Sequence, residues 1–336
     1  MNSGPGRTAN PLVAYRRTAG WLALVLIAAA ASAAQAAEVA LYRESVPLKG
    51  TTEADRNAAF GEALSSVVVR VSGQRDAGSS PGVNASAGRA NRLVQQYSAT
   101  PEGELKVGFD AATIDEILQD AGLPFWPSER PVTLVVMSGV AGAGALRVGD
   151  ASLERAQLEL AAKARGVPLV WPLTGVSIET ARAQLEASGV EAVARAAGTE
   201  ADAVLIGLLT GSGADWTLVH AGDASRRRGS AEDGAHLTAD TFADIYAPAS
   251  TRGLSTVAVR IGGVESLQAY AGLLDELESL SMVRGIGVGE LDGATLRLSL
   301  TLRGDLELLR RIAMLTPRLR PAPGGDPGAP QFVYLP

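Results

Sequence analysis

The stretch MVRGIGVGELDGATLRLSLTL, residues 282–302, decides the fold of the C-terminal part of the chain. Apolar residues alternate with small or polar ones on both sides of the pair Asp292-Gly293, a preferred sequence for a two-residue hairpin turn. The pattern therefore predicts an antiparallel hairpin of two strands, at 282–290 and 294–302.

Two helical patterns flank this hairpin. Residues 266–280 and 306–315 place apolar residues every three or four positions, the spacing of a helix that buries one face. Strands are expected at 256–261 and 332–335. The resulting order, βαββαβ, is typical of the ferredoxin-like motif, and we predict a ferredoxin-like domain over residues 253–336. The first helix is expected to turn these side chains inward: Leu267, Tyr270, Leu274 and Leu277.

The preceding sequence predicts two more small domains. Residues 37–128 give the order βααβα, an α+β domain in which a surface loop at 77–88 precedes a helix at 89–97. Residues 129–252 alternate strands with helices, which predicts a mixed α/β sheet with helices on its faces. One helix of this second domain is expected to bury an apolar stripe: Leu153, Ala156, Leu160 and Ala164.

Residues 1–36 have the three-part pattern of a secretory signal peptide. Arg7, Arg16 and Arg17 precede an uncharged apolar run over 21–34, and small residues lead up to Ala36. The run is shorter than the roughly 20 residues that cross a bilayer, so we expect cleavage near Ala36 and a periplasmic protein. An uncleaved anchor is the alternative. No later segment predicts a transmembrane helix.

The composition excludes several classes of protein. The chain has no cysteine, which excludes disulfides, thiolate zinc sites and a lipid anchor on cysteine. Its net charge is −6, so we expect no nucleic-acid partner. Aromatic residues make up 4% of the chain, too few for a sugar-binding cleft. Lysines are scarce among the basic residues: Lys49, Lys106 and Lys163.

We predict no catalytic, cofactor-binding or metal-binding site. His220 and His236 have no carboxylate or second histidine at ligand spacing, and both are expected on the surface. The sequence Gly211-Ser212-Gly213 lacks the helix that follows a serine nucleophile and is interpreted as a hairpin turn.

The glycine-rich stretches predict no phosphate-binding loop. Gly142-Ala143-Gly144 is followed by Arg147 where a dinucleotide turn needs its third glycine. Gly285, Gly287 and Gly289 lie inside a predicted strand, where β-bulges or close backbone contacts explain them.

Two clusters of charged residues are the remaining candidates. The run Arg226-Arg227-Arg228 lies between glycines and predicts a flexible loop tip, with binding of an anionic envelope polymer as the alternative. One helix concentrates acidic residues, of which the first is expected to cap the helix and the others to lie on a solvated face. The alternative is a pair of glycosidase carboxylates. These residues are Asp110, Asp115, Glu116 and Asp120.

Several segments together carry a family resemblance. They are VRVSG (69–73), LVQQY (93–97), FD (109–110), ILQDAGLPFW (117–126), RP (130–131) and ADAVLIG (201–207). With these segments the chain resembles an uncharacterised family of exported bacterial proteins, a domain of unknown function of the DUF-2066 type. That resemblance implies no activity, cofactor or catalytic residue. Residues 196–207 also resemble a docking module of envelope assembly proteins.

We therefore expect a non-enzymatic interaction or assembly module of the cell envelope, with an envelope protein as its partner and no cofactor. The alternatives are an envelope-polymer hydrolase that uses carboxylates and a periplasmic small-ligand binding protein. Two carboxyl groups facing each other in a cleft would favour the hydrolase, and a deep apolar pocket at the strand ends would favour the binding protein.

Overall fold

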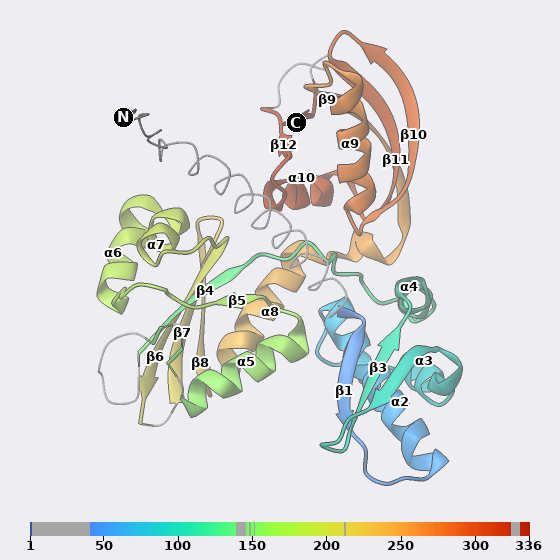
Figure 1. Cartoon of the computed structure of the whole chain (residues 1–336), viewed down its shortest axis with the longest axis vertical. Coiled ribbons are helices and arrows are strands. Elements are labelled where there is room, and N and C mark those ends of the chain that lie inside the picture. The colour runs from blue at the N-terminus through green and yellow to red at the C-terminus, as the bar shows by residue number, and fades with distance from the viewer. Residues whose placement is uncertain (2–40, 139–145, 148, 151, 212, 324–329) are drawn as a thin grey trace. The chain divides into compact units, whose positions relative to one another are not determined.

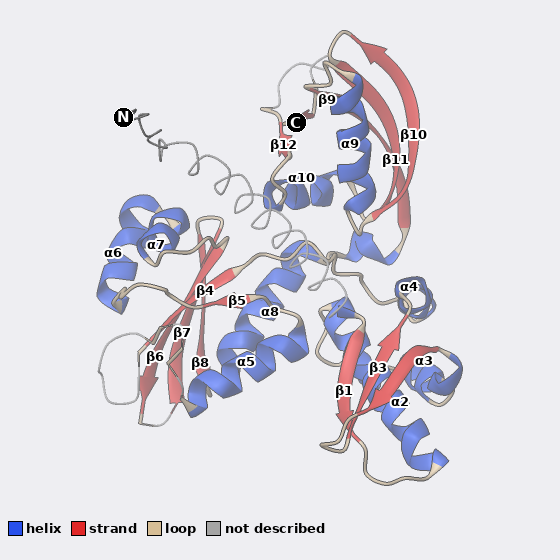
Figure 2. Cartoon of the chain, viewed as in Figure 1, coloured by secondary structure: helices blue, strands red, loops and turns tan. Residues whose placement is uncertain are grey.

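The computed structural model describes Met1 and residues 41–138, 146–147, 149–150, 152–211, 213–323 and 330–336 (Figure 1). Residues 2–36 of the predicted signal peptide lie outside the described residues, as do Gly142-Ala143-Gly144 and Ser212. The described part of the chain is a mixed α+β protein with nine α-helices and three sheets (Figure 2).

The first sheet is antiparallel, with the strand order β1-β3-β2. Thr52 begins α2 through a capping box with Asp55, and Gly73 ends this helix in the left-handed conformation at φ 73°. Both helix ends were predictable from these residue types. The elements are β1 (Arg43–Pro47), α2 (Glu53–Ser72), α3 (Pro81–Ala87), β2 (Val94–Ala99), β3 (Glu104–Phe109) and α4 (Ala111–Asp120).

Two predictions for the first sheet and its helices are wrong. Most of the expected loop at 77–88 is helical, because Pro81 fits the first turn of α3, where its missing N–H costs nothing. Most of the expected helix at 89–97 is instead a short turn followed by β2. Five of the six residues of β2 are exposed, so this segment has no buried stripe that could stabilise a helix.

The second sheet has the strand order β5-β4-β6-β7-β8, parallel from β5 to β6 and antiparallel from β6 to β8. Side chains of α6 and α7 pack on one face, and those of α5 and α8 on the other. The elements are β4 (Thr133–Met137), α5 (Leu153–Arg165), β5 (Leu169–Val170), α6 (Ile178–Ser188), α7 (Val190–Ala196), β6 (Ala203–Thr210), β7 (Gly213–His220), β8 (Asp223–Gly229) and α8 (Glu232–Tyr246).

The buried face of α5 differs from the predicted one. Leu153 and Leu160 are 70% and 69% exposed, whereas Leu158 is fully buried. The helix also buries Ala161, Ala162 and Arg165. Both faces of α5 carry apolar residues, so periodicity alone could not choose between them, and contacts with α8 and the sheet decide the orientation.

The third sheet has the strand order β10-β11-β9-β13-β12. The predicted hairpin forms between β10 and β11, where Asp292 pairs with Thr295 and Gly293 has a φ of 60°. The elements are β9 (Leu254–Gly262), α9 (Leu267–Ser279), β10 (Val283–Asp292), β11 (Thr295–Arg303), α10 (Leu306–Leu315), β12 (Leu319–Pro321) and β13 (Phe332–Tyr334).

The ferredoxin-like assignment of this sheet is not confirmed. The strand that directly follows α10 is β12, but β13 takes the place beside β9 and pairs with it in parallel. The sequence did not predict β12, because three residues that include a proline give no alternating pattern.

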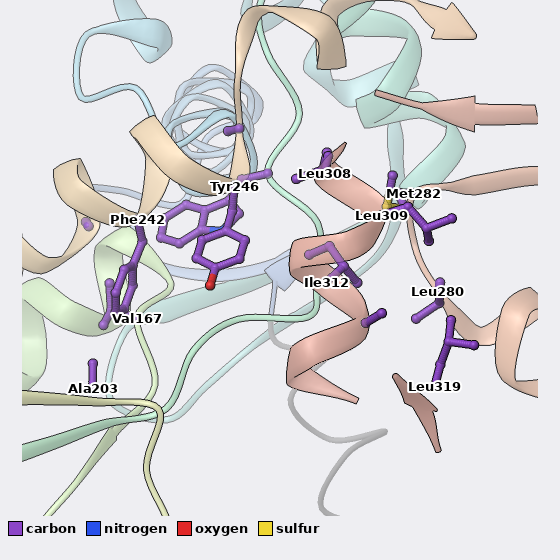
Figure 3. Packing of buried hydrophobic residues seen from close by; sticks show 14 of the residues in the cluster. Val167, Ala203, Phe242, Tyr246, Leu280, Met282, Leu308, Leu309, Ile312 and Leu319 are labelled. Carbon is purple, nitrogen blue, oxygen red and sulfur yellow. The ribbon is translucent and has the colours of Figure 1, made fainter. Parts of the chain in front are cut away.

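Buried apolar side chains join the second and third sheets in one cluster. Figure 3 shows Phe242 and Tyr246 of α8 in this cluster with Leu308 and Ile312 of α10. The three-domain layout therefore stays a prediction. None of the described helices is long and apolar enough to cross a membrane.

Arginine side chains occupy buried positions between the layers. Arg130 donates hydrogen bonds to the main-chain oxygens of Arg70, Pro127 and Gly166, at 2.9, 3.2 and 2.9 Å. Its guanidinium carbon lies 3.8 Å from the ring centre of Trp126. Burial lowers the pKa of Arg130 to about 9, so it remains charged at neutral pH. The carbonyl oxygens replace the water that this charge has lost.

Candidate functional site

The structure places His220 in the core, contrary to the predicted surface position. His220 ends β7 and is 8% exposed. Its Nδ1 lies 2.9 Å from the main-chain oxygen of Asp202, and its Nε2 lies 2.9 Å from the hydroxyl of Tyr246. Burial raises the pKa of Tyr246 to about 12. Strand alternation turns position 220 toward α8, which makes His220 a structural residue.

His236 belongs to a polar cluster centred on Asp240 of α8. The carboxylate of Asp240 accepts hydrogen bonds from Arg165 at 2.7 Å and from Arg227 at 3.0 Å, and Arg75 lies 3.5 Å away. Arg165 also donates to Nδ1 of His236 at 3.2 Å, which requires the neutral imidazole with its proton on Nε2. No group of three metal-ligating side chains occurs within the described ranges.

The charges of this cluster fix its protonation state. Burial opposes ionisation of Asp240, but the hydrogen bonds from Arg165 and Arg227 and the charges of Arg165 and Arg75 outweigh it. Together they hold the pKa of Asp240 below its usual value. Burial, together with the charges of Arg75 and Arg165, lowers the pKa of His236. At neutral pH the cluster therefore holds a carboxylate and a neutral imidazole.

A polar cavity of about 650 Å³ lies beside this cluster, and Asp240 is part of its lining. Asp76, Asp244, Arg75 and Arg252 also line it. A glycosidase needs one carboxyl group that stays protonated until it donates its proton. The lowered pKa of Asp240 is unsuited to that role.

The acidic helix α4 corrects a second prediction. Asp110 caps the helix as expected and accepts a hydrogen bond from the N–H of Thr113 at 3.1 Å. Asp115 is not on a solvated face, because its side chain is only 13% exposed and forms ion pairs with Arg303 and Arg284. Burial lowers the pKa of Arg303 to about 10. Glu116 and Asp120 are exposed, as expected.

The run Arg226-Arg227-Arg228 is part of β8 rather than a loop tip. β8 pairs with β7 along its length, so alternate side chains point to opposite faces of the sheet. Arg227 bonds to Asp240, and Arg228 bonds to Asp215 at 2.5 Å. These arginines therefore belong to an edge strand, and two of them are paired with carboxylates.

An apolar surface lies where the first turn of α9 meets β10. It comprises Leu267, Tyr270, Val288 and Leu291, and we call it the α9–β10 groove. Val288 pairs with Leu298 and Leu291 with Leu296, and both partners are buried beneath the helices. Directly paired residues point to the same face of a sheet, so Val288 and Leu291 also point to the helix side. They are nevertheless 51% and 52% exposed. β10 thus presents apolar side chains that its own helix does not cover.

An apolar hollow of about 700 Å³ lies at one end of the α9–β10 groove. Leu267 and Tyr270 of α9 and Leu291 of β10 line it, with Val264 and Ala294. Leu267 is 83% exposed, although the sequence pattern predicts it to face the core. The pattern failed here because Leu267 is the first residue of α9, and the buried stripe begins at Ala269.

The sequence offered β-bulges or close backbone contacts as explanations for the glycines of β10, and bulges occur beside two of them. The pairing of β10 with β11 shifts between Val283 and Gly285, and again between Val288 and Leu291. The run Gly285–Val288 between these shifts pairs without interruption. The glycines therefore indicated irregular pairing within this strand. They did not reveal that the strand lies at the edge of its sheet.

Comparison with known proteins finds a family match in the part of the chain that contains the first sheet and its helices. A family model described as a domain of unknown function (DUF8605) matches residues 33–127. No curated protein and no solved structure shows a significant match. The match supports a domain of unknown function but not the DUF-2066 type. It indicates no enzyme family.

Proposed function

We propose that the protein is a non-enzymatic interaction module of the bacterial cell envelope, exported to the periplasm and bound there to an envelope protein. The α9–β10 groove is the observation that carries this proposal. Its exposed apolar hollow lies beside an open strand edge, and burying such a surface against a partner is favourable.

The N-terminal sequence supports the compartment. The basic residues, apolar run and small residues of 1–36 are the pattern that export requires. The DUF-2066-type resemblance to exported proteins belongs to the same proposal. The same proposal includes a division into domains at 37–128, 129–252 and 253–336, of which the last is ferredoxin-like.

The two alternatives have weaker support. A hydrolase needs a protonated carboxyl group in its cleft, and the Arg-bound Asp240 does not provide one. A small-ligand carrier needs an enclosed apolar pocket, whereas the apolar hollow is bordered by half-exposed and exposed side chains.

Site-specific photo-crosslinking in intact cells tests the proposal. A photoreactive phenylalanine at position 288 is expected to give adducts of one defined mass, because this position lies in the α9–β10 groove. The matched control places the same residue at position 226, on the edge strand β8. Adducts from neither position, or from both equally, would contradict the proposal. Osmotic shock of the same cells tests the periplasmic location.

A further inference from the structure

β10 differs from the other edge strands in the described sheets. β5 and β12 have only two and three residues, and β1 ends at Pro47. β2 is interrupted by a bulge near Val94, and β8 carries Arg226-Arg227-Arg228. Shortness, proline, bulges and charges each discourage pairing with another chain. β10 has ten residues and no proline. It carries Arg284, Glu290, Asp292 and two bulges, but the run Gly285–Val288 between the bulges is uncharged and pairs without interruption.

The two faces of β10 differ in a way that suits an added strand. Gly285 pairs with Thr301 and Gly287 with Ser299 on the face away from the helices. A chain beside β10 meets no bulky side chain of β10 there. On the helix side it meets Val288 and then the apolar hollow. An extended segment there would bury its alternate side chains in the α9–β10 groove.

The segment that forms this groove is acidic. Between Gly263 and Ala294 the chain has six acidic residues and a single basic residue, Arg284. Arg284 is paired with Asp115, at 3.4 Å, and Arg297 of the neighbouring strand β11 lies 3.9 Å from Glu290, so the acidic residues still outnumber the basic ones. The helix α9 itself carries three acidic residues and no basic residue. The acidic residues of this segment are Glu265, Asp275, Glu276, Glu278, Glu290 and Asp292.

Resting on the proposed function, we infer that the α9–β10 groove binds an extended, basic and apolar segment of a partner protein, which adds to β10 as a further strand (Figure 1). Main-chain hydrogen bonds to β10 align the segment. Apolar side chains of the segment enter the hollow, and basic side chains lie opposite the acidic residues. A second copy of this chain fits less well, because two acidic grooves repel each other.

Binding of designed peptides to the purified protein tests this inference. The probe is a synthetic peptide of about ten residues in which Val and Lys alternate, matched to the length of β10. It is expected to bind, and to bind more weakly at high salt because screening reduces the charge attraction. Two control peptides should bind at least about tenfold more weakly: the Val/Glu version, and the Val/Lys version with a central proline that cannot donate a strand hydrogen bond.

Variants of the protein locate the binding site. Val288→Lys should weaken binding of the Val/Lys peptide about tenfold, because it adds a positive charge to the edge and removes an apolar contact. The matched control is Leu254→Lys, at an exposed position in the same sheet. It should leave binding unchanged. Circular dichroism checks that both variants fold, and Val288→Thr provides a milder change at the same position.

Three results would overturn the inference. They are no binding of the Val/Lys peptide, equal binding of the Val/Lys and Val/Glu peptides, and hydrogen-exchange protection at another strand in place of β10. A dimer that Val288→Lys dissociates would assign the groove to a second copy of the chain. If position 288 crosslinks in cells but the peptides do not bind, the protein is still an interaction module. In that case the inference that the partner adds a strand to β10 is wrong. If the peptides bind but no adduct forms in cells, the proposed function fails.

Discussion

At the residue scale, the carboxylate of Asp115 has a structural role, because it forms an ion pair with the buried Arg303. Arg303 is fully buried and donates to the main-chain oxygen of Thr251 at 2.7 Å. A buried guanidinium needs a negative partner, and Asp115 supplies it from α4. The sequence could place Asp115 on the polar side of its helix. It could not reveal an arginine 188 residues further along the chain.

Removing the carboxylate of Asp115 should therefore destabilise the protein. Asp115→Ala leaves the buried charge of Arg303 without its ion-pair partner, and we expect a loss of about 3 kcal/mol in the free energy of unfolding. Urea denaturation followed by circular dichroism measures this loss. Glu116→Ala, at the exposed neighbouring position, should change the stability by less than about 0.5 kcal/mol. Equal effects of the two substitutions would show that the ion pair carries no stability.

His236 gives the stability a pH dependence whose sign follows from its lowered pKa. Burial and the nearby arginines favour neutral His236 in the folded protein, whereas an unfolded histidine titrates near 6.5. The unfolded state therefore binds a proton first as the pH falls. The contribution of neutral His236 is complete above about pH 6.5 and decreases below it, toward the lowered folded-state pKa.

The variant His236→Gln should remove this part of the pH dependence, because glutamine can still accept from Arg165 but does not titrate. Between about pH 7.5 and 5.5, the wild-type protein should lose more unfolding free energy than the variant. Urea denaturation at both pH values measures the difference. His220 is present in both proteins, so the comparison isolates the contribution of His236. Identical losses would mean that His236 has an ordinary pKa in the folded state.

At the element scale, α5 shows that an apolar residue in a helix is not always buried. Leu158 and Leu160 are two residues apart and chemically identical, but only Leu158 lies in the core. Two positions along a helix correspond to opposite sides of its surface. The sequence correctly predicted the helix but chose the wrong face.

This difference predicts unequal effects of the same substitution. Leu158→Ala should cost about 3 kcal/mol of unfolding free energy, because it leaves a cavity in the core. Leu160→Ala should cost less than about 0.5 kcal/mol, because the side chain is largely in water. Thermal or urea denaturation of the pair measures both. A larger loss for Leu160→Ala would place the predicted stripe in the core after all.

At the scale of the whole molecule, local signals predicted elements better than their arrangement. The hairpin at Asp292-Gly293, the cap at Asp110 and the mixed second sheet follow from short-range patterns. β12 and the position of β13 depend on contacts between distant segments, which no local pattern encodes.

The same limit applies to the candidate site. The glycines of β10 were visible in the sequence, and register shifts beside Gly285 and at Gly289 agree with their interpretation as bulges. That β10 lies at an edge depends on the strand order of the complete sheet. The exposure of Leu267 and Leu291 likewise depends on where α9 begins and where the bulge falls. The α9–β10 groove was therefore beyond the reach of the sequence alone.

The scarcity of lysine has a practical consequence for measurements on this groove. Lys49, Lys106 and Lys163 are exposed, and none of them belongs to the third sheet or its helices. Amine coupling to a biosensor chip would therefore attach the protein through other surfaces. The immobilised molecules would keep β10 accessible to an analyte, and chemical acetylation of the lysines should leave its capture undiminished.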